Sequence, residues 1–316
     1  MILVTGSAGF IGFNLCKKLL EEGFPVIGID DINDYYDTKL KKDRIDELKK
    51  SKKFIFIKKD ILDINKKDMD NVEFVFHEAA YAGVRNSVEN PLLYDTVNVH
   101  GTVNLLKLSV DANVKKFMFA SSSSVYGDID KYPTPETYET NPISPYGVSK
   151  LAAEKYCDVF YKCYGLPAIS FRYFTVYGPW GRPDMLIMKI IKSCYEGQPL
   201  TVFKKDGKTV DFSRDFSYID DVVQANILAM KSSIKNAVFN VSSKHEVKVK
   251  YIIDFIIKET GKKPKFTEAE ASPADPLRSL ADISRIERML GFKPRVDIEE
   301  GIRKTIEWYK WYNKIK

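Results

Sequence analysis

Three side chains that could remove a proton from an alcohol are spaced for joint action. Tyr146 and Lys150 are one helical turn apart, so on a helix both would face the same side. Ser122 lies 24 residues before that tyrosine, in a run of four serines. A phenol with its ordinary pKa of about 10 is a poor base at neutral pH, but a nearby ammonium favours the phenolate. The trio therefore predicts Tyr146 as a general base acting on a hydroxyl group.

The first residues of the chain predict a binding site for a dinucleotide. Gly6, Gly9 and Gly12 follow an expected strand and open an expected helix. Glycines in this context let the backbone turn tightly and approach a pyrophosphate, which the helix N-terminus stabilises. Asp30 ends the second expected strand, 18 residues after Gly12. A carboxylate there binds ribose hydroxyls and repels a 2′-phosphate, so the sequence predicts NAD and not NADP.

The elements that must position these residues alternate between strand and helix. The expected strands are Ile2–Thr5, Val26–Asp30, Phe54–Lys58, Val72–His77, Phe117–Ser121, Ala168–Tyr173, Thr201–Phe203, Val210–Phe216 and Ala237–Val241. The expected helices are Phe10–Glu22, Thr38–Lys50, Pro91–Asp111, Ser144–Cys163, Met185–Glu196, Tyr218–Ser232, Lys248–Thr260, Ile283–Leu290 and Ile298–Tyr312. This alternation predicts an α/β fold with a Rossmann-type doubly wound parallel sheet.

A smaller α/β domain, interleaved with the first, is expected where the alternation breaks near Pro179. We expect residues 1–173 and about 214–242 to form the NAD-binding domain. Residues of about 174–213 and 243–316 would then form the second domain, which would bind the substrate.

Composition excludes several classes of protein. The net charge is +6, and the lysine-rich segment Lys39–Lys53 also carries acidic residues, which favours a solvated helix face over a nucleic-acid surface. Four cysteines without paired spacing and three histidines predict neither a metal site nor a disulfide framework. We expect no membrane span, because no apolar segment reaches about 18 residues, and without a leader-like segment we expect a cytoplasmic protein.

The ordered set of motifs resembles the extended short-chain dehydrogenase/reductase family. These motifs are Thr5–Gly12, Asp60-Ile61, Val125-Tyr126-Gly127, Tyr146-x-x-x-Lys150, Arg172-Tyr173-Phe174, Arg214-Asp215-Phe216 and Ala281-Asp282-Ile283-Ser284. Within that family the chain is similar to nucleotide-sugar 4-epimerases, and most of all to UDP-glucuronate 4-epimerases. The segments that carry this closer similarity are Ile29–Asp37, Ala82-Gly83-Val84-Arg85 and Phe174–Asp184.

The resemblance implies an isomerase with tightly bound NAD that inverts C4 of a UDP-sugar through a transient 4-keto intermediate. Tyr146 would be the base, Lys150 would hold the nicotinamide ribose, and Ser122 would bond the sugar O4. The implied cofactor contacts are Gly6, Gly9, Phe10, Ile11, Gly12, Asp30, Asn33, Asp60, Ile61, Ala80, Tyr146, Lys150 and Tyr173. The implied substrate contacts are Ser122, Ser123, Thr175, Arg182, Phe203, Arg214 and Arg278.

The resemblance also implies a homodimer, in which the two helices expected at Pro91–Asp111 and Ser144–Cys163 would form a four-helix bundle with their copies.

Ser123 and Ser124 favour epimerisation over related reactions. Dehydratases and decarboxylating enzymes of this family carry acidic residues just before Val-Tyr-Gly, where they protonate a leaving hydroxyl or an enolate. This chain has hydroxyls there instead.

Two departures leave the sugar open between UDP-glucuronate and UDP-glucose or UDP-N-acetylglucosamine. The usual small-Gly-Asp signature is replaced by Pro273-Ala274-Asp275, and an upstream arginine by Ser272, for which Arg278 could substitute. The segment from Arg278 to Asp282 looks more like UDP-N-acetylhexosamine 4-epimerases. A non-catalytic NAD-sensing protein of the same fold is a further alternative, disfavoured because such proteins typically lose the Tyr–Lys pair.

Overall fold

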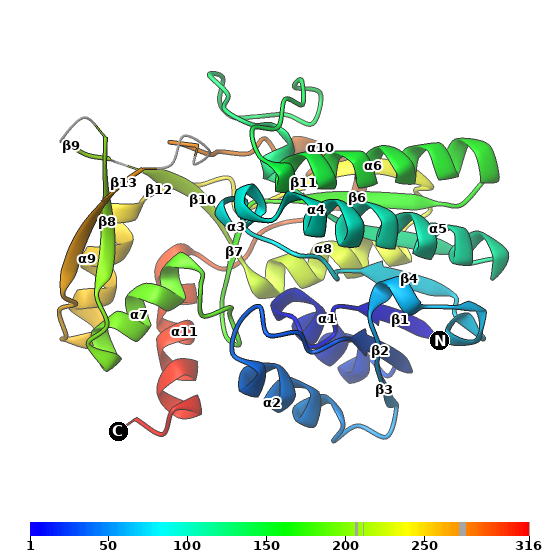
Figure 1. Cartoon of the computed structure of the whole chain (residues 1–316), viewed down its shortest axis with the longest axis horizontal. Helices are drawn as coiled ribbons and strands as arrows, with labels where there is room; N and C mark the ends of the chain where they lie inside the picture. The colour runs from blue at the N-terminus through cyan, green and yellow to red at the C-terminus, as the bar shows by residue number, and fades with distance from the viewer. Residues whose placement is uncertain (206–207, 211, 272–275, 316) are drawn as a thin grey trace.

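A seven-stranded parallel sheet forms the centre of the molecule (Figure 1). The computed structural model describes residues 1–205, 208–210, 212–271 and 276–315. The strand order is β11-β6-β5-β4-β1-β2-β3, and all neighbouring pairs run parallel. The strands are β1 Ile2–Thr5, β2 Val26–Asp30, β3 Phe54–Lys58, β4 Phe74–His77, β5 Lys116–Ser122, β6 Ala168–Tyr173 and β11 Asn236–Val241. The predicted Rossmann-type doubly wound sheet is confirmed, as is the return of the strand near residue 237 to it.

Helices cover both faces of this sheet, and alternate residues of β1 show why. Ile2 and Val4 pack in the hydrophobic cluster under α1 (Phe10–Glu21), α2 (Thr38–Leu48) and α8 (Ile219–Lys231). Leu3 points to the opposite cluster, under α5 (Gly101–Asp111) and α6 (Pro145–Tyr164). A strand buried on both faces reads as a continuous apolar run, which is how β1 could be recognised in the sequence.

The helix expected over Pro91–Asp111 is not one regular helix. It consists of α4 (Pro91–Tyr94), a π-helical segment η3 (Asp95–His100) and α5, and α3 (Val84–Glu89) precedes it. The other short helical turns are η1 Ile61–Asp63, η2 Lys66–Met69 and η4 Ser123–Val125.

Two small sheets and four helices make up most of the remaining chain (Figure 1). One sheet has the order β12-β10-β7 and the other β13-β8-β9. These strands are β7 Thr175–Tyr177, β8 Leu200–Lys205, β9 Lys208–Thr209, β10 Ser213–Tyr218, β12 Glu246–Lys248 and β13 Phe266–Glu270. The helices are α7 Leu186–Glu196, α9 Val249–Thr260, α10 Ser284–Leu290 and α11 Ile298–Tyr312. The division into two interleaved domains stays a proposal, and Ser272 and Pro273-Ala274-Asp275 lie outside the described residues.

Within the described ranges, no helix combines the length and the apolar character that crossing a membrane requires.

Candidate active site

The start of α6 is packed directly on the serine turn that follows β5. Ser144 caps the helix by accepting a hydrogen bond from the Gly147 N–H at 3.1 Å. A Cβ atom on Gly147 would lie 2.5 Å from the carbonyl oxygen of Ser124, so only glycine permits this close approach. The tight contact brings the first turn of α6, with Tyr146, against Ser122 at the end of β5.

The phenol of Tyr146 is buried and interacts with the side chain of Ser122. Burial raises the pKa of Tyr146, while the Ser122 side chain and the charge of Arg182 act in the opposite direction. Without ligands the burial effect is the larger one. The phenol therefore depends on a bound cation as well as on its protein neighbours to become a base.

Lys150 is buried one turn further along α6. Its ammonium donates to the carbonyl oxygen of Ala120 at 2.7 Å and lies 5.0 Å from the centre of the Phe119 ring. Burial lowers the pKa of Lys150 to about 8, and the negative charge of Glu78 partly opposes that change. The ammonium thus stands at the carboxyl end of β5, where the predicted role places it.

Glu78, which the sequence analysis did not single out, adds a carboxyl group to this cluster. It follows β4, and its Oε1 accepts a hydrogen bond from the hydroxyl of Tyr173 at 3.2 Å. Burial raises the pKa of Glu78 to about 7, and Lys150 opposes that shift. The neighbouring His77 is a packed imidazole: its two ring nitrogens bond Thr5 and Thr102, and burial lowers its pKa to about 3.

The turn after β1 has the shape that a pyrophosphate site needs. Gly6 has a φ of 70°, and a Cβ on Gly12 would lie 2.1 Å from the Gly6 carbonyl oxygen. Gly9 is the N-cap of α1 and has no side chain that could cap the helix. The N-terminus of α1 is therefore left open to an anion. The glycine turn therefore fits the diphosphate of NAD.

Asp30 and the next turn form the far end of this cradle. The carboxylate of Asp30 accepts hydrogen bonds from the backbone N–H groups of Ala8 at 3.0 Å and Ile32 at 2.8 Å, and burial raises its pKa. Asn33 is already engaged, because its side chain bonds Asp31 and Lys41. Its implied contact with the cofactor would require these bonds to rearrange.

The remaining residues implied for the cofactor lie at the carboxyl ends of neighbouring strands. Phe10 and Ile11 begin α1, Asp60 and Ile61 follow β3, Ala80 follows β4, and Tyr173 ends β6. Asp60 caps η1 by accepting from the Leu62 N–H at 2.9 Å.

The prediction of a solvated face for the lysine-rich helix α2 is wrong at two positions. Lys41 and Arg44 are buried, with 4% and 0% of their surface exposed. Arg44 donates to the carbonyl oxygen of Ala8 at 2.7 Å and also to that of Trp180. It thereby ties the glycine turn to the loop that carries Arg182. The pattern of charges in the sequence could not reveal that Lys41 and Arg44 are buried, because exposed basic residues stand between and around them.

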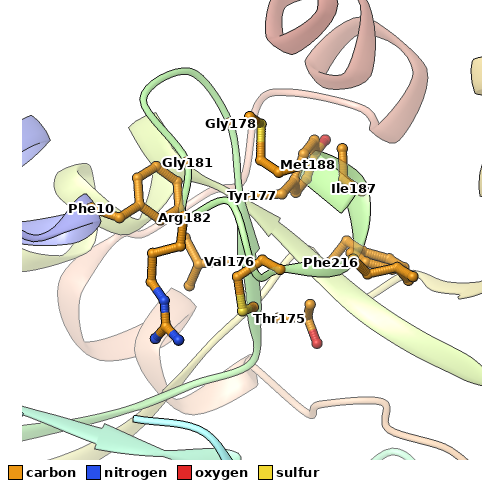
Figure 2. Close-up of a pocket in the computed structure, with 12 residues that line it drawn as sticks. Phe10, Thr175, Val176, Tyr177, Gly178, Gly181, Arg182, Ile187, Met188 and Phe216 are labelled. Atoms are coloured by element: carbon orange, nitrogen blue, oxygen red, sulfur yellow. The ribbon is translucent and has the colours of Figure 1, made fainter. Parts of the chain in front are cut away.

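Thr175 and Arg182 line a small pocket next to Phe10 of α1 (Figure 2). Figure 2 shows the guanidinium of Arg182 extending away from the apolar side chain of Met188. Arg182 forms a two-point pair with Asp184, at 3.0 and 2.5 Å. This pocket joins the cofactor turn to the first implied substrate contacts.

Phe203 and Arg214 lie on the small sheets and Arg278 lies in an irregular segment, and all three are outside that pocket. The guanidinium carbon of Arg85 lies 4.1 Å from the centre of the Phe203 ring, in β8. Arg214 of β10 donates to the carbonyl oxygens of Ser213 and Leu277. Arg278 is paired with Glu246 at 2.6 Å.

Comparison with known proteins agrees with this fold. Residues 2–242 match the model of the NAD dependent epimerase/dehydratase family. A UDP-glucuronate 4-epimerase of Thermodesulfobacterium geofontis is 40% identical over 312 residues, covering 98% of this chain and 95% of that protein. The structure of UDP-glucuronic acid 4-epimerase from Bacillus cereus, in complex with UDP-glucuronic acid and NAD, superposes with a TM-score of 0.93. It is 35% identical and covers 98% of this chain and 99% of that chain.

A second solved structure carries a different sugar specificity. UDP-N-acetylglucosamine 4-epimerase from Methanobrevibacter ruminantium, in complex with UDP-N-acetylmuramic acid, has a TM-score of 0.90. It is 30% identical and covers 98% of both chains.

The chain is an α/β protein with a dinucleotide cradle and a Ser–Tyr–Lys cluster. It belongs to the NAD dependent epimerase/dehydratase family, and its cofactor is NAD.

Proposed function

We propose that this chain, an NAD-dependent nucleotide-sugar 4-epimerase, interconverts UDP-glucuronate and UDP-galacturonate. The observation that supports the reaction type is the packing of Tyr146 and Lys150, at the start of α6, against the serine turn that carries Ser122, with serines at 123 and 124 in place of acids. Proton transfer at one hydroxyl needs only Tyr146, Ser122 and Lys150. Elimination or decarboxylation would also need an acid at the serine turn.

In this proposal Tyr146 accepts the proton of the sugar O4 and later returns it, while Ser122 holds that oxygen in place. NAD, when bound, supplies the acceptor and later the donor of the hydride at C4. Lys150 holds the nicotinamide ribose and adds positive charge beside the phenol. These roles require the 4-keto sugar to turn within the site before the hydride returns to its other face.

Arg182 and Arg214 anchor the diphosphate while the sugar ring turns. A guanidinium binds phosphate through two parallel hydrogen bonds, which fixes orientation as well as position. Arg182 already makes such a two-point pair with Asp184, so diphosphate binding exchanges one anionic partner for another.

Neutral hydroxyl groups hold the uronate carboxylate. Ser122, Ser123 and Thr175 supply them, from the end of β5, from η4 and from the first residue of β7. A 4-ketouronate is a β-keto acid and loses CO₂ when its ketone is strongly polarised. Hydroxyls bind the carboxylate without adding a positive charge near that ketone, so they protect the intermediate. If Thr175→Val and Ser123→Ala together leave uronate turnover and product purity unchanged, this part is wrong.

UDP-glucose or UDP-N-acetylglucosamine is the alternative substrate. Ser279 favours it, because a small residue there leaves room for a bulkier sugar, and the Methanobrevibacter ruminantium enzyme is similar over 98% of this chain. In the structure Ser279 accepts a hydrogen bond from the Asp215 N–H at 3.3 Å.

A competition assay decides among the sugars and excludes a merely NAD-sensing protein. UDP-glucuronate, UDP-glucose and UDP-N-acetylglucosamine are mixed in equal amounts with the enzyme, and the C4 epimers are followed by NMR. We expect the galacturonate product to form first. In Tyr146→Phe turnover should fall by about 10²–10⁴, the usual contribution of a positioned acid–base group. Tyr156→Phe, on the exposed side of the same helix, is the matched control and should act like the parent protein.

We also propose a homodimer, formed through α4 and α6. Leu92, Val148 and Val159 are large apolar side chains with 81%, 53% and 46% of their surface exposed. Val148 also lines a groove together with Pro91, Val99 and Ile143. An exposed apolar strip on adjacent helices favours a self-complementary contact between two copies.

A further inference from the structure

Glu78 is an acid at the cofactor end of the site that none of the assigned roles uses. Its backbone N–H donates to the carbonyl oxygen of Thr5, the last residue of β1, at 3.3 Å. A Cβ on Gly6 would lie 2.9 Å from the carbonyl carbon of Glu78. Glu78 is therefore in direct contact with the glycine turn, and its side chain remains partly exposed in the ligand-free chain.

A directed hydrogen-bond chain orients the carboxyl group. The amide of Asn226 donates to the hydroxyl oxygen of Tyr173 at 2.7 Å, and a second hydrogen bond to the carbonyl oxygen of Val222 fixes that amide. The single proton of Tyr173 is then free to point at Glu78, at 3.2 Å. A donor aimed at a carboxylate favours its ionised form.

Few charged groups face Glu78 from the surrounding elements. Lys150 and Tyr146 of α6, Tyr173 of β6 and Cys16 of α1 interact with it electrostatically. Burial raises the pKa of the two phenols and the thiol, so these three are neutral near pH 7 until a bound cation favours the phenolate of Tyr146. Glu78, with a pKa of about 7, and Lys150 are therefore the acid and the cation nearest the expected nicotinamide position.

We propose that the carboxylate of Glu78 makes the site prefer the oxidised, positively charged form of NAD over the neutral reduced form. Attraction between the carboxylate and the cationic ring lowers the free energy of the oxidised complex, whereas the reduced ring carries no charge to attract. An enzyme that begins each turnover by removing a hydride needs its resting cofactor oxidised. The inference depends on NAD as the cofactor and not on which sugar is bound.

A cofactor-exchange experiment without any sugar tests this preference. The enzyme is incubated with an equal excess of NAD⁺ and NADH until the bound ratio is constant, then desalted and denatured, and the released nucleotides are quantified. Glu78→Gln keeps the shape and loses the charge, so its bound NAD⁺:NADH ratio should fall about tenfold, or ~1.4 kcal/mol. Glu78→Asp keeps the charge and should stay within about threefold of the parent. A ratio in Glu78→Gln equal to that of the parent overturns the proposal.

The parent protein alone provides a second test that does not depend on the variants folding. The pKa of Glu78 is about 7, so raising the pH from 5.5 to 7.5 ionises it. This range stays below the pKa of Lys150, about 8, whose loss of charge would also favour the oxidised form. The bound NAD⁺:NADH ratio should rise several-fold across this range, and an unchanged ratio refutes the role of Glu78. Because no sugar is present, failure of the proposed epimerase reaction would leave both results interpretable.

Discussion

Glu154→Gln should destabilise the protein strongly, because it breaks a buried ion pair that locks α6 onto the sheet. Arg172 donates to both carboxylate oxygens of Glu154, at 3.0 and 2.6 Å, and the two side chains are 4% and 2% exposed. The hydroxyl of Ser121 donates to the same carboxylate at 2.9 Å. Ser121 immediately precedes Ser122, and Glu154 lies one turn after Lys150, so the pair fixes the elements that carry two of the three proposed catalytic groups.

The expected loss follows from what is left unpaired. Glutamine keeps one acceptor oxygen but leaves the buried guanidinium without a counter-charge, which costs about 3–5 kcal/mol. For a domain of this size each kcal/mol lowers the melting temperature by about 2–4 °C, so the variant should melt about 6–20 °C lower. Lys162→Met, on the same helix, removes a cation with 66% of its side chain exposed and should cost less than about 1 kcal/mol.

A double variant separates the cost of an orphaned charge from the strength of the pair. Glu154→Leu combined with Arg172→Met removes both charges at once, and apolar replacement of a buried pair is often neutral. We expect it to recover most of the stability lost in Glu154→Gln. The assay is thermal unfolding with saturating NAD, followed by circular dichroism. A melting temperature for Glu154→Gln within about 2 °C of the parent would refute the reasoning.

Three further changes test other parts of the structure. Gly147→Ala places a Cβ 2.5 Å from the Ser124 carbonyl oxygen, so it should push the first turn of α6 off the serine turn. We expect kcat to fall more than about tenfold while NAD binding persists. Burial holds the pKa of His77 near 3, so folding stability is complete above the unfolded pKa of about 6.5 and is lost as the pH falls. Between pH 6.5 and 5 that loss is about 2 kcal/mol in urea unfolding, and His77→Asn should lack it. Val148→Glu puts a charge on an apolar position that is 53% exposed and should turn the proposed dimer into a monomer by light scattering; a dimer that survives there would contradict the interface.

The parts of the site that the sequence could predict are those carried by local spacing. Gly6 to Gly12 opens a helix directly after a strand, and Tyr146 and Lys150 share a helix, so the pattern and the structure concern the same few residues. The positions of the strands in the central sheet also follow from local signals, since each buried strand is a short apolar run between amphipathic segments. Here the structure confirms what periodicity predicts.

The parts that could not be predicted depend on what a residue meets across the fold. Arg44 lies in a run of mixed charge, and only the approach of Trp180, 136 positions later, makes it a buried bridge. Strand β13 has the sequence Phe-Thr-Glu-Ala-Glu with every residue exposed, so it contains no apolar run from which a strand could be predicted. Glu78 follows a buried strand and belongs to no periodic pattern in the sequence. Its environment is formed by Tyr173 and Lys150, which come from other elements.

The position of Glu78 also bears on why a carboxyl group in this site need not lead to elimination or decarboxylation. Those reactions require an acid on the side of the sugar, where η4 presents Ser123 and Ser124. Glu78 instead follows β4, contacts the glycine turn and accepts a hydrogen bond from the hydroxyl of Tyr173. An acid held there is on the cofactor side of the proposed site, away from the serine turn where those reactions need a proton donor. Stabilising the oxidised cofactor returns the hydride sooner and shortens the life of a ketone that can lose CO₂. If the proposed substrate is correct, such a site would protect the 4-ketouronate twice, with neutral hydroxyls at the sugar and with a negative charge at the cofactor.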